Sequence, residues 1–357
     1  MIVIHLQNMK KALLLSFYLC LLSGVSFAQT DSTSSITVTG YIDCYYAYNF
    51  TEPTSNNIPF AYNHNRHNEF NVNNVVVGLK YSNRRLRSNL LLHAGTYVKA
   101  NYAAEPTLLQ FINEASVGVK LSKKIWLDAG IMPSHIGMET AISKDNWTLT
   151  RSLCAENSPY YETGAKLSFV PNSKLSLAFL VLNGWQNIEE KNSNKAVGTQ
   201  VQFVPTKKWL INYSTFLGEG KNLPDSLQVL RHFHDVYFTW LISDKLAIAS
   251  VFDFGYEQKS KTDKSFAGWY TPALLVRCKL TKQWNTCLRA EYFNDQNRII
   301  GINNEVTGFS LNLDYAPMEN ALIRIEGKTF PTRDTQGNFA PDSFVNSTFS
   351  LSFALGF

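Results

Sequence analysis

The chain has 357 residues and a formal net charge of +5, from 33 Lys and Arg against 28 Asp and Glu. This small excess of positive charge argues against a nucleic-acid-binding protein. Aromatic residues make up 13% of the chain, and no stretch after Ala28 comes near the roughly eighteen apolar residues of a membrane-spanning helix. The composition therefore excludes a helical membrane protein.

Residues 1–28 are predicted to be a secretory signal peptide. Two lysines open the stretch "KKALLLSFYLCLL", whose apolar run is too short to span a bilayer, and "SFA" places small residues where a signal peptidase reads, with cleavage after Ala28. Residues 29–357 would then form one domain. Met1 and Met9 both stay open as the start of translation. A secreted chain of this kind is either a soluble β-protein or a membrane-spanning barrel.

The rest of the chain is predicted to be all-β. In "TGFSLNLDY", residues 307–315, Thr and large apolar side chains fall on one face, and Gly, Ser, Asn and Asp on the other, as expected for a strand with one apolar face. No helix of ordinary length is expected. The sixteen predicted strands span residues 36–49, 69–81, 87–100, 109–121, 124–136, 160–170, 174–184, 195–205, 208–217, 231–242, 244–257, 265–281, 283–295, 304–316, 319–330 and 343–357.

The connections between these strands alternate strictly between short turns, such as "LSKK", "PTKK" and "SDK", and long loops, such as 50–68 and 137–159. All tight turns therefore fall at one end, which is the pattern of outer-membrane barrels and is not required of a β-sandwich. An even strand number lets the last strand pair with the first, so that no backbone polar group is left unpaired in hydrocarbon. We predict a closed antiparallel transmembrane β-barrel of about 16 strands, with short periplasmic turns and long extracellular loops.

Aromatic residues beside the tight turns are predicted to form an interfacial girdle. Trp126 is an exception, because in the alternation of its strand it falls on the same face as Asp128 and not on the face of its apolar neighbours. His64 and His67, in the first long loop, are expected at a solvated loop tip. The girdle residues on the apolar parity are Tyr81, Trp209, Trp240, Trp284 and Tyr315.

Charged residues lie in the middle of several strands, on the polar face, where they are predicted to line a water-filled lumen. On a lipid-facing surface each Arg or Lys near the midplane would cost roughly 2–4 kcal/mol. Arg277, Arg289 and Arg324 should form a cationic patch on one wall. The alternative is a set of inward salt bridges that fill the barrel. The predicted pore-lining residues are Lys166, Arg277, Lys279, Arg289, Glu291, Asp314, Arg324 and Glu326.

Four stretches resemble the beta-barrel porin-2 (OmpL-like) family of Gram-negative outer membranes. They are "GYIDCYYAYNFTEP", the segment from "LDAGIMPSHIGMET" through "NWTLTRSLCAENSPYYETGAKLSF", "LNGWQNI", and "NNEVTGFSLNLDYAPMENALIRIEGK". The resemblance implies a porin-like channel without naming its solute. It also implies that the barrel-assembly machinery reads the last strand, whose terminal Phe357 shares the apolar parity of Phe353 and Leu355.

The resemblance to porins further implies a constriction at the third long loop, residues 137–159, because the third external loop of general porins folds into the barrel. We expect its acids to face the arginine wall and to set a transverse field that orients polar solutes. The alternative is that the loop packs as a plug or as a rim contact. The charged residues of this loop are Glu139, Lys144, Asp145, Arg151 and Glu156.

The expected function is passive diffusion of small hydrophilic solutes across the outer membrane. The alternatives are a structural or adhesive barrel with a plugged lumen and, less favoured, a lipid-modifying enzyme. No nucleophile elbow, phosphate loop or H-E-x-x-H motif occurs, so no catalytic residue, cofactor or metal is predicted. The expected partners are outer-membrane lipid, the assembly machinery and solutes, with no nucleic acid; a homo-oligomer stays open, as do pore radius and selectivity.

Overall fold

The computed structural model describes residues 34–190, 194–219, 229–259, 262–301, 305–331 and 346–357. The predicted signal peptide lies outside these residues. Within them, no helix is long and apolar enough to cross a bilayer.

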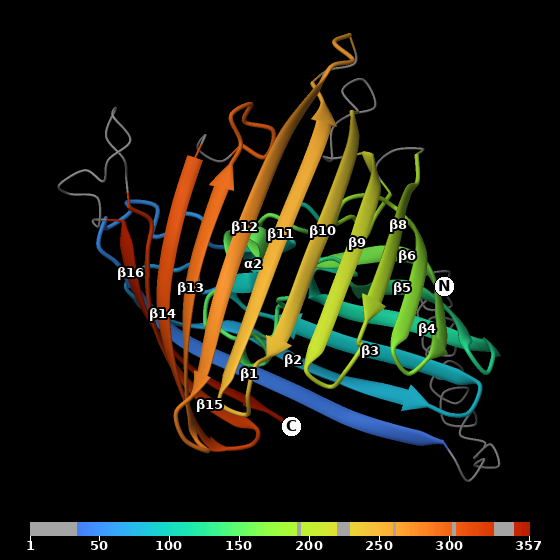
Figure 1. Cartoon of the computed structure of the whole chain (residues 1–357), viewed down its shortest axis with the longest axis horizontal. Helices are drawn as coiled ribbons and strands as arrows, with labels where there is room; N and C mark the ends of the chain where they lie inside the picture. The colour runs from blue at the N-terminus through green and yellow to red at the C-terminus, as the bar shows by residue number, and fades with distance from the viewer. Residues whose placement is uncertain (1–33, 191–193, 220–228, 260–261, 302–304, 332–345) are drawn as a thin grey trace, which may run out of the picture.

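The described residues form sixteen antiparallel strands in one closed barrel, each paired with its neighbour in the chain and β1 paired with β16 (Figure 1). The predicted fold is therefore confirmed. The strands are β1 (Ser35–Asn49), β2 (Glu69–Ser82), β3 (Leu86–Ala94), β4 (Ile112–Ser122), β5 (Ile125–Pro133), β6 (Tyr161–Asn172), β7 (Leu175–Leu182), β8 (Ala196–Phe203), β9 (Trp209–Glu219), β10 (Leu230–Leu241), β11 (Leu246–Gln258), β12 (Phe266–Lys279), β13 (Trp284–Asn294), β14 (Glu305–Met318), β15 (Ala321–Thr329) and β16 (Ser347–Gly356).

The two faces of the wall differ as the alternation predicts. On β14, Leu311 is 55% exposed on the outer face, whereas its neighbour Asn312 is fully buried on the inner face. On β13, Leu288 is 57% exposed and Arg289 only 2%. At these positions the apolar side chains therefore look outward and their polar neighbours look into the barrel.

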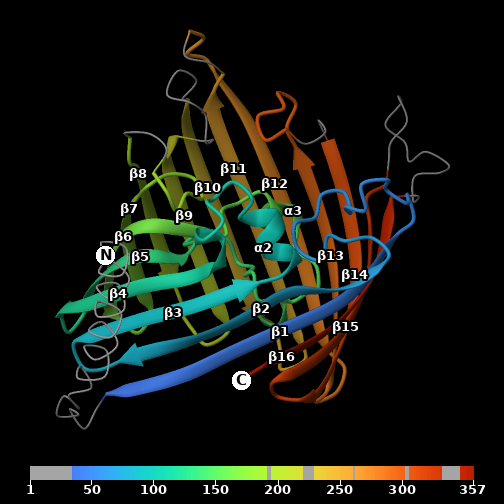
Figure 2. The ribbon, with the colours of Figure 1, turned by 180° about the vertical axis from the view of Figure 1, so that it is seen from behind.

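The third strand is shorter than predicted, and the assignment of residues 95–100 to it is wrong. Gly95 has a φ of 139°, and a Cβ at this position would lie only 2.3 Å from the carbonyl oxygen of Asn73. The chain leaves the wall at this glycine and forms helix α2 (Thr96–Asn101) and then the 3-10 turn η1 (Leu109–Phe111). Helix α2 lies inside the ring of strands (Figure 2). Its apolar residues pack against loop residues and against the inner face of the barrel wall.

The aromatic residues at the turn end lie as expected, and the exception of Trp126 is explained. The rings of Trp209 and Trp240 stack with their centroids 4.9 Å apart on the outer face. The guanidinium carbon of Arg87 lies 4.4 Å from the centroid of the Trp126 ring, and its Nε donates to Asp128 Oδ1 at 2.6 Å. Trp126 is thus an inward-facing residue held by a cation–π contact.

The barrel closes at its C-terminus through backbone pairing. The Gly40 amide donates to the Phe357 carbonyl at 2.8 Å, and the Phe357 amide donates back to the Gly40 carbonyl at 2.9 Å. The tip of the Phe357 ring lies directly over Gly40, only 2.2 Å from where a Cβ would be. The final aromatic residue is therefore part of the seam between β1 and β16.

Candidate functional site in the barrel lumen

Loop 137–159, between β5 and β6, crosses the lumen to the opposite wall. It contains the 3-10 turn η2 (Ser143–Asp145) and the short helix α3 (Leu153–Glu156). The Leu153 amide donates to Glu291 on β13 at 2.6 Å, and the Leu149 amide donates to Asn312 on β14 at 3.0 Å. The loop is therefore attached to a wall more than a hundred residues away in sequence.

Arg289 is the centre of this attachment. Its Nη1 donates to Thr148 Oγ1 and to the Thr150 carbonyl, each at 2.7 Å. Its guanidinium also lies 3.1 Å from Glu326, 3.5 Å from Glu291 and 3.9 Å from Glu139. The planar fork of an arginine can satisfy carboxylates and backbone carbonyls together, which explains how one side chain ties the loop to the wall.

Arg324 makes a second attachment of the same kind. It contacts Asp314 through two nitrogens, at 2.8 and 3.1 Å, and donates to the carbonyls of Ser143 and, at 3.1 Å, Asn146. Its side chain has no exposed surface. Both arginines thus use their positive charge on wall acids and their remaining donors on the loop backbone.

This arrangement differs from the expected transverse field. Five predicted lining residues lie on the inner wall but under the loop, so they do not face water. Charge in such a dry position must be paired with an opposite charge, which is what the structure shows. The five residues, none of them more than 3% exposed, are Arg289, Glu291, Asp314, Arg324 and Glu326.

The charged residues of the loop are also mostly committed to local contacts. Glu139 accepts from the Ser152 amide, and Glu156 accepts from Tyr160 at 2.6 Å. The Arg151 guanidinium lies 3.6 Å from the centroid of the Tyr160 ring. Lys144 and Asp145 pair with each other at 2.7 Å and remain partly exposed.

The other three predicted lining residues lie apart from this network. Arg277 and Lys279 are near the turn end of β12, where the Arg277 guanidinium lies 6.0 Å from the centroid of the Trp147 ring. Lys166 on β6 is half-buried and opposite Asp128, which pairs with Arg87 instead. These cations make no ion pair within the described residues.

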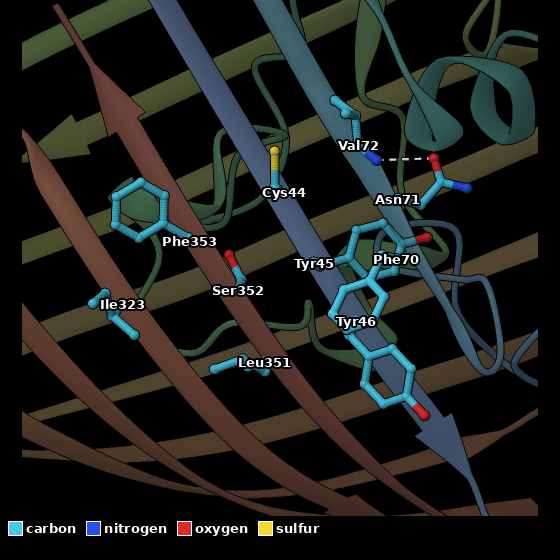
Figure 3. A pocket seen from close by; sticks show the side chains of 10 residues that line it. All are labelled: Cys44, Tyr45, Tyr46, Phe70, Asn71, Val72, Ile323, Leu351, Ser352 and Phe353. Atoms are coloured by element: carbon cyan, nitrogen blue, oxygen red, sulfur yellow. Dashed lines mark hydrogen bonds between the residues drawn. The ribbon is translucent and has the colours of Figure 1, made fainter.

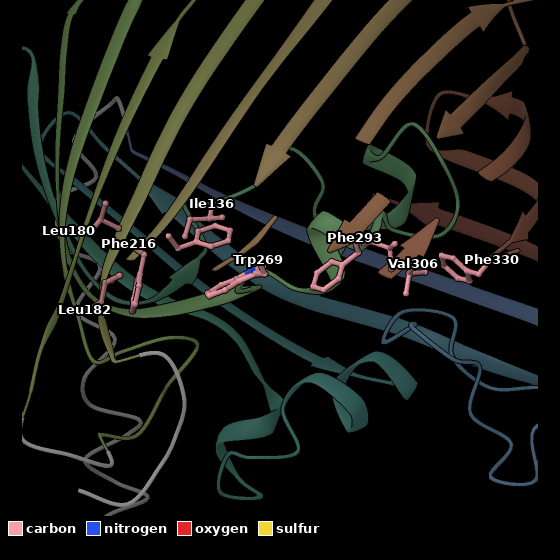
Figure 4. Packing of buried hydrophobic residues seen from close by; sticks show 11 residues of the cluster. Ile136, Leu180, Leu182, Phe216, Trp269, Phe293, Val306 and Phe330 are labelled. Atoms are coloured by element: carbon pink, nitrogen blue, oxygen red, sulfur yellow. The ribbon is translucent and has the colours of Figure 1, made fainter. Parts of the chain in front are cut away.

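An apolar layer on the inner wall was not predicted. Inward-facing side chains of β7 to β14 pack with Ile136 and Leu153 of the loop region (Figure 4). The sequence does indicate this layer, because segments such as "FAGWY" and "EYFN" place apolar residues on both faces of the strand. The inward members include Leu180, Leu182, Phe216, Phe233, Trp269 and Phe293.

The first long loop also folds inward, so the predicted solvated tip at His64 and His67 is wrong. His64 Nε2 lies 2.8 Å from Asp43 on β1, and neither side chain has exposed surface. His67 Nδ1 accepts from the Asn49 amide at 3.0 Å. These histidines hold the loop against the inner wall because imidazole nitrogens can satisfy buried polar groups.

The cavities of the molecule lie on both faces of the wall. A groove of about 450 Å³ runs along the outer face of the seam, lined by Phe70, Ile323 and Phe353 among others (Figure 3). Inside, a cavity of about 340 Å³ lies on the loop side next to Glu156, and one of about 370 Å³ lies on the turn side next to Trp147. Loop 137–159 contributes to both inner cavities.

Solved structures with the same architecture are outer-membrane proteins. The outer-membrane channel DcaP of Acinetobacter baumannii aligns with a TM-score of 0.61 at 9% identity, covering 92% of this chain and 99% of the other. An anion-selective porin from Comamonas acidovorans gives 0.59 at 9%, covering 91% and 100%. The trimer form of OmpT, an outer-membrane protein of Vibrio cholerae, gives 0.60 at 9%, covering 91% and 100%.

At such identities these likenesses show the fold alone, and a search of curated proteins returned no match. A family model, "Putative beta-barrel porin-2, OmpL-like", matches residues 35–357, nearly the whole chain. The sequence resemblance and the predicted location are thereby confirmed. The chain belongs to the beta-barrel porin-2, OmpL-like family and is a porin-like barrel of the Gram-negative outer membrane.

Proposed function

We propose that the protein is a channel for passive diffusion of small hydrophilic solutes. The observation that carries this proposal is a polar arc of the inner wall, made of partly exposed side chains on β3, β4, β6 and β8. Asn89 donates to Glu114 at 2.7 Å and Ser116 donates to it at 2.9 Å, and all three side chains are half-buried. Lys166 and Gln202 continue this arc on β6 and β8.

This polar arc differs from the wall of β13 to β16, whose inward charges are buried. Barrels of about 16 strands are wide enough to enclose an aqueous channel. When one side of such a barrel is filled by a loop, water and solutes have to pass along the other side. The polar arc therefore supports a narrow passage, with Lys166 and Glu114 in contact with what passes.

A barrel with a closed lumen is the second candidate function. It is supported by the apolar layer around Trp269 and Phe293, because apolar side chains packed against loop residues exclude water from that level of the lumen. In this alternative the protein would have a structural or adhesive role. The fixed attachment of loop 137–159 to Arg289 and Arg324 supports the same alternative.

Liposome swelling separates the two candidates. Purified, folded protein in vesicles should admit small sugars and exclude larger ones at a rate that rises with the amount of protein. Vesicles that stay osmotically intact in every sugar would support the closed barrel and contradict the channel. Heat-modifiable migration on gels controls for folding.

We propose no catalytic role, and lipid hydrolysis by the purified protein would contradict this.

The surrounding partners are lipid and the assembly machinery, which would recognise the strand that ends at Phe357. The trimer form of OmpT, the structural neighbour from Vibrio cholerae, supports a homo-oligomer. Chemical crosslinking in native membranes tests that assembly.

A further inference from the structure

We propose that the turn-side mouth of the lumen contains a binding site for small anions that carry carboxylate or phosphate groups. The site is the cavity of about 370 Å³ between loop 137–159 and the turn ends of β11 to β13. The inference rests on the proposed channel function for its role in transport, because the site lies where a solute would enter or leave. Its residues are Trp147, Lys245, Arg277, Lys279, Lys282 and Asn285.

Arg277 and Lys279 point into the barrel because they continue the inward parity of β12. Ala273 and Leu275, four and two positions before Arg277, are buried on that face at 2% and 0% exposure. Arg277 stands opposite Ala247 on β11 and Cys287 on β13 in the strand register. The two cations therefore line the lumen and do not face lipid headgroups outside.

Among the described residues that line this cavity, positive charges outnumber negative ones. Lys245, Arg277, Lys279 and Lys282 all line it, and Asp244 is the one carboxylate among the lining residues. None of these four cations makes an ion pair within the described part of the chain. By contrast, Arg289 on β13 and Arg324 on β15 both have carboxylate partners at 3.1 Å or less.

Uncompensated like charges repel one another, and a bound anion would relieve that repulsion. The chemistry of the lining suits such a ligand. A guanidinium recognises carboxylate and phosphate through paired hydrogen bonds, whereas each ammonium acts as a point charge. The Trp147 ring, 6.0 Å from the Arg277 guanidinium carbon, forms an apolar side of the cavity next to that cation.

Anion binding can be measured without any transport. Folded protein in an uncharged, phosphate-free detergent is titrated with citrate and with inorganic phosphate by calorimetry. We expect saturable binding that weakens as salt rises. The double variant Arg277→Gln/Lys279→Gln should bind at least about tenfold more weakly, the effect of losing one charge-assisted hydrogen bond.

The matched control removes the same charge elsewhere. Lys123→Gln/Lys124→Gln neutralises two exposed lysines in the turn between β4 and β5 and should leave binding unchanged. Lys279→Gln alone, at an exposed side chain, keeps the test valid if the double variant does not fold. Equal loss in both double variants, or no binding by wild type, would overturn the site. Binding to anionic lipid vesicles but not to free citrate or phosphate would also overturn it.

Planar bilayers then test the role of the site in transport. With a salt gradient, the reversal potential of wild type should show preference for chloride over potassium, and Arg277→Gln/Lys279→Gln should reduce it. Citrate binding without any conductance would leave the anion site standing and reject the channel. Conductance with an unchanged reversal potential and unchanged citrate binding in the variant would reject the anion site alone.

Discussion

Replacing Arg289 with leucine would remove the guanidinium that ties loop 137–159 to the wall while keeping an apolar stem. The change would leave Glu326 buried without its cation, which lies 3.1 Å away, and would leave Glu291 with Lys328 alone, at 3.2 Å. Breaking a buried ion pair by removing one partner costs about 3–5 kcal/mol. We therefore expect Arg289→Leu to lower the free energy of unfolding by about this amount, mostly through release of the loop.

Two measurements check this prediction. Urea unfolding in detergent gives the free-energy change, and Arg66→Ala is the control, because the Arg66–Glu69 pair is partly exposed and should contribute less than about 1 kcal/mol. Alkylation of Cys154, located by mass spectrometry, reports on the loop. Its thiol is buried and donates to the Thr271 carbonyl at 3.1 Å, and burial raises its pKa.

In wild type Cys154 should resist alkylation, and in Arg289→Leu it should react because the loop has left the wall. The unitary conductance should rise as well. An unfolding free energy within about 1 kcal/mol of wild type, together with an unreactive Cys154, would refute the assignment of Arg289 as the anchor of the loop.

Two further predictions concern the wall and the pH dependence. Gly164→Val should reduce the heat-modifiable, folded fraction, because a Cβ would lie 2.0 Å from the backbone carbonyl oxygen of Val181 on the neighbouring strand; Gly327→Ala, with no atom within 4 Å of its added Cβ, should not. Burial raises the pKa of Glu156, so the folded state binds this proton more tightly than the unfolded state and stability falls as pH rises through the folded pKa. Urea titrations across pH should show this slope in wild type and lose it in Glu156→Gln; parallel curves would contradict it.

The strands could be predicted from sequence because alternation is local. Residues 307–315 place Leu311 on the outer face and Asn312 on the inner face, as the structure does. Phe357 could likewise be assigned to the closing strand from parity alone. Gly95, where the chain leaves the wall, could not be recognised, because the space for a Cβ is taken by the backbone of Asn73, which is not a sequence neighbour.

The lumen was harder to predict than the wall. Parity shows that Arg289 faces inward, but only the fold of loop 137–159 shows that it is dry. Likewise, only the fold of the first long loop shows that His64 is buried against Asp43 on β1. Inward aromatic residues such as Trp269 were missed because an inner face was expected to be polar, whereas inward loops supply apolar partners for them.

Thiol labelling of the inner wall tests most directly whether the passage follows the polar arc. Ser116→Cys lies on that arc, and Ser350→Cys lies on the wall of β13 to β16, where the native serine is 2% exposed. A charged, water-soluble thiol reagent added to single channels should block Ser116→Cys and leave Ser350→Cys and wild type conducting. Block of Ser350→Cys with Ser116→Cys unaffected would place the water on the opposite wall and contradict the account.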